Sequence, residues 1–316
     1  MPIITSTAPV APPVFIPEVG YATITYWDPV GTPWPMTDHS AARGYYVLAD
    51  GVSGLGAAPY ELTTDPYPRG GAKLRHAQPQ PRNIVWPLHI GGKDHNEFVS
   101  RWRALAKAFT RTLRDGPGTL DIALPDGSRR QINVLYQEGF DGLGTFGSGI
   151  TWDNAVITLF CEDPYWVDPV AQAVHREYGV GEDFLQPYPS VSSGQVLGAT
   201  TVTNPGDIIV WPTWVISGPA SLVTFTRTDT GEAFVLDPNA TPIGHGALLA
   251  GEQVTVTTDP PTVRYQDGSN WVGALDWPDA VLWGLAPGDN AVTFQLDGSG
   301  PGSAVDLSYN PRYETP

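Results

Sequence analysis

The stretch that decides the fold begins with Ile84-Val85-Trp86-Pro87-Leu88-His89-Ile90. These residues are mostly apolar and rich in strand formers, and Gly91 and Gly92 end the run, so we expect a strand. The stretch continues to residue 139 and reads, in order, as strand, helix, strand and strand. It holds the only convincing helix pattern of the sequence, so we expect a mainly β protein with one α-helix.

The helix is expected over residues 94–114, because apolar side chains recur there at helical spacing and form one stripe. The stripe consists of Phe98, Trp102, Leu105, Phe109 and Leu113. Asp94 and Glu97 have the spacing of a capping box, which favours a helix start at this point. Gly116 and Pro117 favour its end, because glycine tolerates the left-handed conformation and proline cannot extend a helix.

The opposite side of this helix is basic. At 100° per residue, Arg103, Lys107, Arg111 and Arg114 lie across from the apolar stripe. Like charges at this spacing repel by a few tenths of a kcal/mol per pair. Either the face is solvated, or acidic groups of a neighbouring protein neutralise it. Arginine suits the second case, because it pairs bidentately with carboxylates. We therefore take these four residues as candidate assembly contacts.

Strands are expected on both sides of the helix. Residues 120–124 and 131–136 form a hairpin around the turn Pro125-Asp126-Gly127, and further strands are expected over 21–26, 45–48 and 150–160. Residues 27–81 are dense in proline and glycine. So long an irregular region in a compact domain is usually functional or ordered by a partner.

The second half shows short alternating patterns, typical of an antiparallel sandwich or jelly roll. Strands are expected over residues 208–211, 213–217, 223–226, 254–257, 292–296 and 305–309. Periodicity is lost over 167–195. We therefore expect an N-terminal domain over residues 1–166, a linker over 167–195 and a C-terminal sandwich over 196–316.

Charge and composition exclude several classes of protein. The 316 residues carry a net charge of −16, with 13 Lys/Arg and 16 Asp/Glu in residues 1–165 against 4 and 17 in residues 166–316. An acidic second half argues against nucleic acid as its partner, because phosphate backbones attract positive charge. No run of eighteen apolar residues and no signal peptide is present, so we expect no membrane span.

No motif supports catalysis or a cofactor. The single cysteine, Cys161, excludes an internal disulfide, and the six histidines lack the spacing of zinc ligands. No nucleophile elbow, P-loop or dinucleotide fingerprint occurs. Glu162 and Asp163 are neighbours on a strand end and face opposite ways, so they cannot flank one bond. We expect no catalytic centre, no metal site and no cofactor.

Tryptophans in the second half leave one binding hypothesis open. On a sandwich, an exposed ring can stack on a sugar, and Trp211, Trp214 and Trp271 are the candidates for such stacking. The alternative is that these rings are packing anchors of the core. Because sandwich folds are reused without their ligands, the fold alone does not decide between the two readings.

Three groups of motifs, taken together, resemble one family. They are residues 113–120 running into 124–129, the strand end 156–166, and the second-half motifs Asn204-Pro205-Gly206-Asp207, Trp211-Pro212-Thr213-Trp214, Ser217-Gly218-Pro219 and residues 285–290. In this order and spacing they resemble a distal tail protein, a kind of minor tail protein, of bacteriophages with long non-contractile tails. The resemblance covers most of the chain after residue 80.

This resemblance implies a fold and a role. The fold would be an N-terminal split barrel that closes into a homohexameric ring, followed by a galectin-like C-terminal sandwich. The ring would be a structural part of the virion and would connect the tail tube to the tail tip or baseplate. Its partners would be the tail tube protein, the tape-measure protein, and the tail-tip hub and receptor-binding proteins. The alternative function is that of a carbohydrate-binding or carbohydrate-cleaving sandwich protein at the host cell surface.

Overall fold

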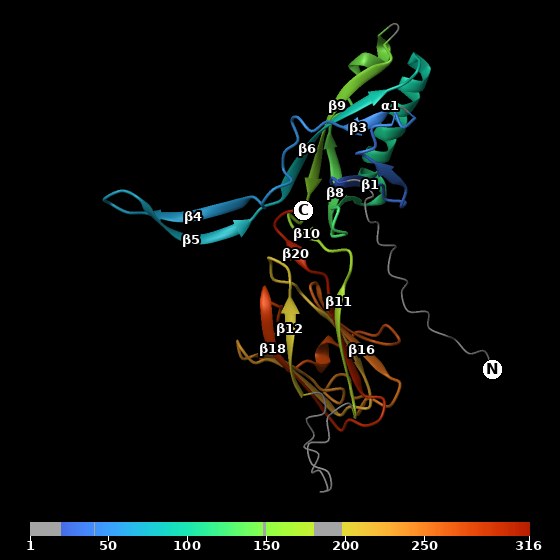
Figure 1. Ribbon diagram of the computed structural model, residues 1–316. Helices are drawn as coiled ribbons and strands as arrows, with labels where there is room; N and C mark the ends of the chain where they lie inside the picture. The colour runs from blue at the N-terminus through green and yellow to red at the C-terminus, as the bar shows by residue number, and fades with distance from the viewer. Residues whose placement is uncertain (1–19, 41, 148–149, 180–197) are drawn as a thin grey trace, which may run out of the picture. The chain divides into compact units, whose positions relative to one another are not determined.

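The computed structural model describes residues 20–40, 42–147, 150–179 and 198–316, and it is mainly β (Figure 1). The chain divides into two compact units. The first contains the residues up to Pro169 together with Tyr313–Pro316, and the second contains Val170–Arg312. No helix in the described part of the chain is long and apolar enough to cross a membrane.

The first unit is a curled antiparallel sheet with strand order β2-β1-β7-β8-β9-β6-β3. Strand β8 joins the two halves of this sheet, because residues 129–134 pair with β7 and residues 135–138 pair with β9, where the register shifts between Tyr136 and Glu138. The strands of this unit are β1 (Thr23–Trp27), β2 (Pro33–Pro35), β3 (Tyr45–Val47), β4 (Tyr60–Pro66), β5 (Ala72–Pro79), β6 (Arg82–Gly91), β7 (Gly118–Ala123), β8 (Arg129–Glu138), β9 (Trp152–Cys161) and β10 (Trp166–Val167). The expected strand at the start of the deciding stretch and the expected hairpin after the helix are both confirmed.

Helix α1 (His95–Thr110) follows β6 and packs its apolar stripe into the curl of the sheet. Asp94 is the N-cap, and its carboxylate accepts a hydrogen bond from the backbone N–H of Glu97 at 2.9 Å. The ring of Tyr26 on β1 stacks on Phe109 with 4.2 Å between the ring centroids, and its hydroxyl donates to the carbonyl of Ala108. The helix is thus fixed to the sheet by both packing and a buried hydrogen bond.

The prediction that Leu113 belongs to the buried apolar stripe is wrong. Leu113 is 60% exposed, because α1 ends at Thr110 and a separate turn, α2 (Thr112–Asp115), follows it. The buried position passes to Thr112, whose hydroxyl donates to the carbonyl of Phe109 at 2.8 Å and accepts from the backbone N–H of Tyr136 at 2.8 Å. A hydroxyl that can satisfy two backbone groups replaces the leucine at the helix end.

The second unit is an antiparallel sandwich of two sheets, with strand orders β11-β19-β13-β16-β17 and β12-β18-β14-β15. Its strands are β11 (Gln172–Glu177), β12 (Gly198–Asn204), β13 (Thr213–Ser217), β14 (Leu222–Arg227), β15 (Glu232–Leu236), β16 (Gln253–Thr258), β17 (Pro261–Tyr265), β18 (Gly288–Asp297) and β19 (Ala304–Tyr309). Residues 208–211 are not a strand, because Ile208 and Val210 form only isolated bridges.

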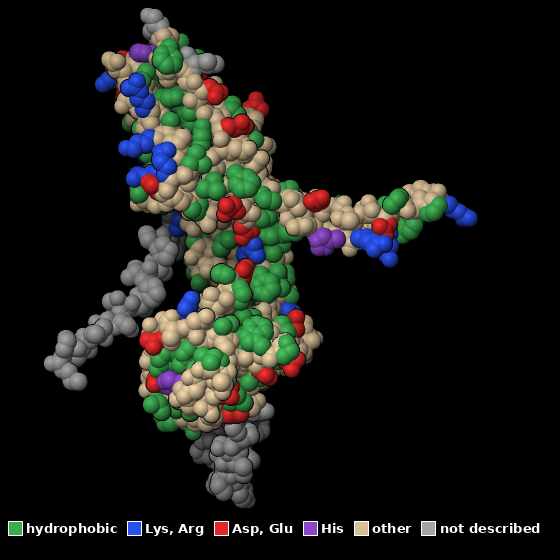
Figure 2. Space-filling view, turned by 180° about the vertical axis from the view of Figure 1, so that it is seen from behind, with side chains coloured by type: hydrophobic (Ala, Val, Ile, Leu, Met, Phe, Trp, Pro, Cys, Tyr) green, Lys and Arg blue, Asp and Glu red, His purple; other side chains and the backbone are tan. Residues whose placement is uncertain are grey.

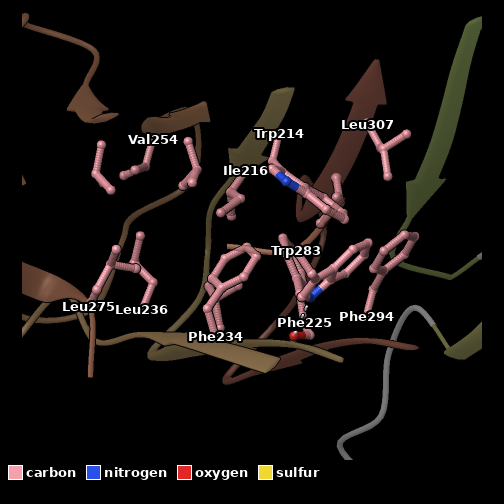
Figure 3. Close-up of a cluster of buried hydrophobic side chains, with 14 of the residues drawn as sticks. Trp214, Ile216, Phe225, Phe234, Leu236, Val254, Leu275, Trp283, Phe294 and Leu307 are labelled. Atoms are coloured by element: carbon pink, nitrogen blue, oxygen red, sulfur yellow. Dashed lines mark hydrogen bonds between the residues drawn. The ribbon is translucent and has the colours of Figure 1, made fainter. Parts of the chain in front are cut away.

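Trp214 on β13 is the centre of the sandwich core (Figure 3). Its ring lies 5.0 Å from that of Phe225 and 5.6 Å from that of Phe294, both on the opposite sheet, and 4.7 Å from that of Trp283. Tilted and edge-on rings at these distances are the favourable geometry of aromatic packing. The alternating residues of the two sheets therefore meet in one aromatic layer.

The expected linker and domain limits need correction. Residues 172–177, placed in the linker, form β11 and pair with β19, from Gln172 opposite Tyr309 to Glu177 opposite Ala304. Their side chains are mostly exposed, which is why no apolar alternation marks them. At the other end, β20 (Arg312–Tyr313) spans the boundary between the units, and residues 313–316 belong to the first unit. The part of the linker over 180–197 lies outside the described residues.

Candidate assembly surfaces

A two-stranded hairpin extends from the first unit, within the region that the sequence marks as irregular. Strands β4 and β5 pair only with each other, and we call residues 60–79 the arm hairpin (Figure 1). Its turn closes with hydrogen bonds between Tyr67 and Gly71 and from Gly70 to Tyr67, and both glycines have positive φ angles. Nearly all of its side chains are exposed, so no core holds it.

The root of the arm hairpin is fixed by polar contacts within the first unit. The carboxylate of Glu314 accepts from the backbone N–H of Ala58 at 2.9 Å and from the hydroxyl of Tyr60 at 3.0 Å. The hydroxyls of Tyr60 and Tyr165 lie 2.8 Å apart, and these hydrogen bonds raise the pKa of Tyr60. The buried guanidinium of Arg82 donates to the carbonyls of Gly56 at 2.7 Å and Glu314 at 3.1 Å. The arm is therefore anchored at its base and exposed along its length.

One face of the arm hairpin is apolar. Tyr60 and Leu62 alternate along β4, and Leu74 pairs with Thr64 on the same face. These three side chains are 43%, 59% and 53% exposed. An isolated two-stranded hairpin is marginally stable in water, and a row of exposed large apolar side chains marks an interaction site. The arm hairpin thus has the character of a surface that another protein covers.

Sequence reasoning missed the arm hairpin because both of its faces are uncovered. Its outer face carries polar residues, among them the pair Thr63 and His76, and the salt bridge between Asp65 and Arg75 crosses the strands. One signal was present. The segment Tyr67-Pro68-Arg69-Gly70-Gly71 has the composition of a turn between two short runs.

The basic residues of the helix region form a second surface. Arg103, Lys107 and Arg114 are exposed, and within the described residues none of the three has an ion-pair partner. Arg111 differs from them, because its Nε lies 2.6 Å from the carboxylate of Asp115. Figure 2 shows Lys and Arg side chains gathered along one side of the first unit. Leu113, next to Arg114 in α2, is exposed as well.

The tryptophans named as candidates for sugar stacking do not form a common surface. Trp214 is 0% exposed and Trp271 is 5% exposed, so neither ring can lie against a sugar, and for these two residues the sequence hypothesis is wrong. Trp271 instead stacks on Tyr265 with 4.5 Å between the ring centroids. Trp211, at 39%, is the exposed ring of the three.

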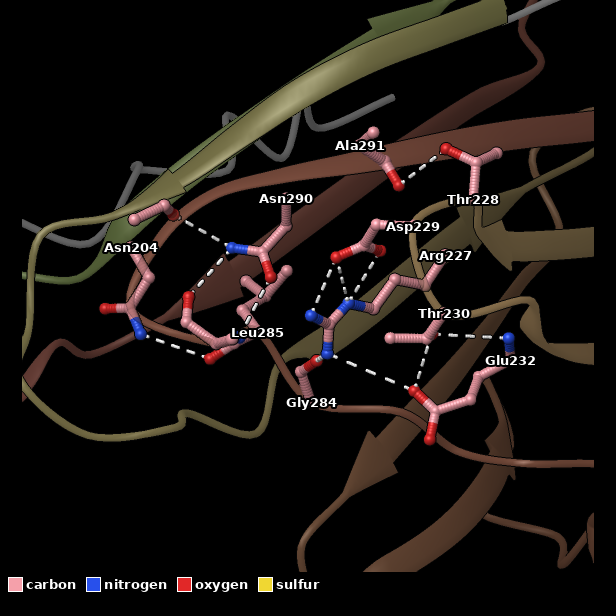
Figure 4. Close-up of polar contacts among 12 residues, drawn as sticks. Asn204, Arg227, Thr228, Asp229, Thr230, Glu232, Gly284, Leu285, Asn290 and Ala291 are labelled. Carbon is pink, nitrogen blue, oxygen red and sulfur yellow. Dashed lines mark hydrogen bonds and ion pairs between the residues drawn. The ribbon is translucent and has the colours of Figure 1, made fainter.

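The buried polar groups of the sandwich hold loops in place (Figure 4). The guanidinium of Arg227 donates to the carboxylate of Asp229 at 2.9 Å and to the carbonyl of Gly284 at 3.0 Å. The amide of Asn290 donates to the carbonyls of Val202 and Ala286. Each group is occupied by a structural partner. Over the described ranges, no cluster of three or more His, Cys, Asp or Glu side chains is placed to hold a metal ion.

Neither a protein-family model nor a curated protein matches this sequence. Among solved structures, the chain is similar to the Dit protein of phage SPP1, reported as a paradigm of the hub adsorption apparatus in phages that infect Gram-positive bacteria. The TM-score is 0.63 at 13% identity, and the match covers 92% of this chain and 98% of that chain.

Two structures of the phage P2 baseplate in its activated conformation, one with Ca and one with Sr, are also similar. Their TM-scores are 0.52 and 0.53 at 10% and 11% identity. The matches cover 93% and 94% of this chain and 99% and 100% of those chains. The chain therefore has the fold of phage tail hub and baseplate proteins over nearly its whole length.

Proposed function

We propose that this protein is a structural component of a phage tail tip, a distal tail protein whose copies associate into a ring of six. The ring connects the tail tube to the host-adsorption complex. The observation that carries the proposal is the likeness to the Dit protein over 92% of this chain and 98% of that one, which includes both units. A fold by itself does not fix a function, so the proposal also rests on the surfaces described above.

Each of the two candidate surfaces can supply one side of a contact between copies. A ring built from identical chains needs two different and complementary patches on each copy. The arm hairpin offers an apolar face with Tyr60, Leu62 and Leu74 exposed, and the basic face offers Arg103, Lys107 and Arg114, which have no ion-pair partner within the described residues. The tail tube, tape-measure, tail-tip hub and receptor-binding proteins are the further partners in this proposal. The location is the distal end of the tail in the virion, and the role involves no catalytic centre, metal or cofactor.

The arm hairpin provides the test of self-association. Substituting Leu62→Asp together with Leu74→Asp should abolish assembly, because it places two charges on the apolar face, and the midpoint of thermal unfolding should stay unchanged. The matched control is Thr63→Asp with His76→Asp, which changes two paired residues on the other face of the same hairpin. Sedimentation velocity of the wild type and both variants measures the outcome. Equal assembly of all three chains would refute a role for the arm hairpin.

A further inference from the structure

Two segments that lie far apart in the chain hold the first residue of the arm hairpin. The hydroxyl of Tyr60 donates to the carboxylate of Glu314 at 3.0 Å and lies 2.8 Å from the hydroxyl of Tyr165. The other carboxylate oxygen of Glu314 accepts from the backbone N–H of Ala58 at 2.9 Å. Because β4 and β5 pair only with each other and their side chains are mostly exposed, the arm hairpin is held at its root and not along its length.

The same two segments lead into and out of the second unit. Tyr165 directly precedes β10, and Glu314 directly follows β20. The second unit consists of residues 170–312, so its whole length lies in the chain between Tyr165 and Glu314. Strands β10 and β20 also pair with each other. A displacement of this strand pair therefore acts on both residues that hold Tyr60.

Arg130 on β8 holds the strand pair to the sheet of the first unit. Its guanidinium carbon lies 3.4 Å from the centroid of the Tyr313 ring, and its Nη1 lies 3.7 Å from the carboxylate of Asp168. Tyr313 belongs to β20, and Asp168 directly follows β10, so one side chain restrains both strands. Neither contact involves the arm hairpin or Glu314.

We propose that these contacts form a latch through which the strand pair β10–β20 controls the arm hairpin. With the strand pair in place, Tyr165 and Glu314 hold the arm hairpin in one direction, so less conformational freedom is lost when it binds a second copy. A protein that binds the second unit and displaces the strand pair breaks the hydrogen bonds to Tyr60 and weakens that contact. The inference rests on the proposed self-association and assigns a regulation to it.

Hydrogen exchange of the full-length chain, below the concentration at which it associates, tests the latch. Glu314→Ala removes the acceptor of two hydrogen bonds, so peptides that cover residues 60–79 should exchange about tenfold faster than in the wild type. Tyr60→Phe removes only a hydroxyl from a half-exposed ring, which leaves the core intact, and should also speed this exchange. The matched control is Thr315→Ala at the neighbouring exposed position, which should leave the rate unchanged.

An effect from a distance distinguishes a latch from a local anchor. Arg130→Gln loosens the strand pair and leaves the root of the arm hairpin intact, so it should speed the exchange of residues 60–79 about threefold. In a chain that already carries Glu314→Ala, the same substitution should add no further increase, because the link is gone. The control is Asn133→Ala at an exposed position of β8, which should not change the exchange.

Two results of the exchange experiments would overturn the inference. One is an arm hairpin that exchanges at the wild-type rate in both Glu314→Ala and Tyr60→Phe. The other is an effect of Arg130→Gln that is absent, or that is equal with and without Glu314. Sedimentation velocity separates this inference from the proposed function. Equal association of the wild type and Glu314→Ala overturns this inference alone, whereas a wild type that is monomeric at every concentration overturns the proposed self-association and this inference with it.

Discussion

At the scale of single residues, burial and side-chain chemistry decide which role a residue has. Trp214 packs against Phe225 in the core, whereas His175 lies on an exposed edge strand between two carboxylates. The sequence identifies Trp214 as an aromatic on an alternating strand but does not tell which face is inward. Thr112 gives a similar lesson, since its two backbone hydrogen bonds, and not hydrophobicity, bury it in place of Leu113.

The core position of Trp214 predicts a large effect of truncation. We expect Trp214→Ala to destabilise the sandwich by about 3–5 kcal/mol, the usual cost of removing a buried aromatic ring. Trp211→Ala, at a 39% exposed ring, should cost less than about 1 kcal/mol. Urea unfolding followed by circular dichroism measures both values. Similar losses for the two variants would contradict the assignment of Trp214 to the core.

His175 predicts a pH dependence of the second unit. Its Nδ1 lies 2.5 Å from a carboxylate oxygen of Asp306 and its Nε2 lies 3.6 Å from one of Glu177. The hydrogen bond to Asp306, with the nearby charges, raises the pKa of His175 above its ordinary value. Its contribution to stability is therefore complete below the unfolded pKa of about 6.5 and is lost as pH rises through the folded pKa.

The expected effect is small, because the His175 side chain is 53% exposed and solvent and salt screen the pair. Thermal unfolding from pH 5.5 to pH 8.5 should show a decline in the midpoint that His175→Asn reduces. The control is His76→Asn, on the exposed arm hairpin, which should leave the decline unchanged. A decline that is identical in all three proteins would rule out this contribution.

At the scale of elements, the sequence was informative wherever one face is buried. The helix and the strands around it were predicted because their apolar residues recur with a clear period. The arm hairpin and β11 were missed because their side chains are exposed on both faces and leave no such period. Burial of one face produces the apolar alternation from which strands are predicted. A strand with both faces exposed shows no such alternation.

The candidate site was predicted in part for the same reason. The basic face follows from the helical period alone, and three of its four residues remain exposed without partners among those described, whereas Arg111 pairs with Asp115. The pairing is local, at i and i+4, but depends on α2 continuing after α1.

The basic face predicts a charge-dependent assembly. Arg103→Glu together with Lys107→Glu should weaken association while leaving the monomer folded, because neither side chain belongs to the apolar stripe. Added salt should weaken the wild type more than the variant, since it screens the attraction to acidic groups. Sedimentation at low and high salt measures both effects. Unchanged assembly of the variant under both conditions would mean that the basic face is merely solvated.

At the scale of the whole molecule, two compact units of different architecture share one chain. The first contains both candidate assembly surfaces, and the second is a sandwich with a continuous aromatic core. The charge follows the same division, since the residues after 165 contain 4 Lys/Arg and 17 Asp/Glu. We therefore expect the first unit to make the contacts between copies and the acidic second unit to keep assemblies soluble.

The mass of the purified chain in solution tests the central proposal most directly. Native mass spectrometry, with electron microscopy of the same sample, should show closed rings with six times the chain mass of 34.0 kDa. Ring closure should give one discrete species, whereas an open assembly would give a ladder of masses. A chain that stays monomeric at every concentration and salt tested, with both units folded, would contradict the account.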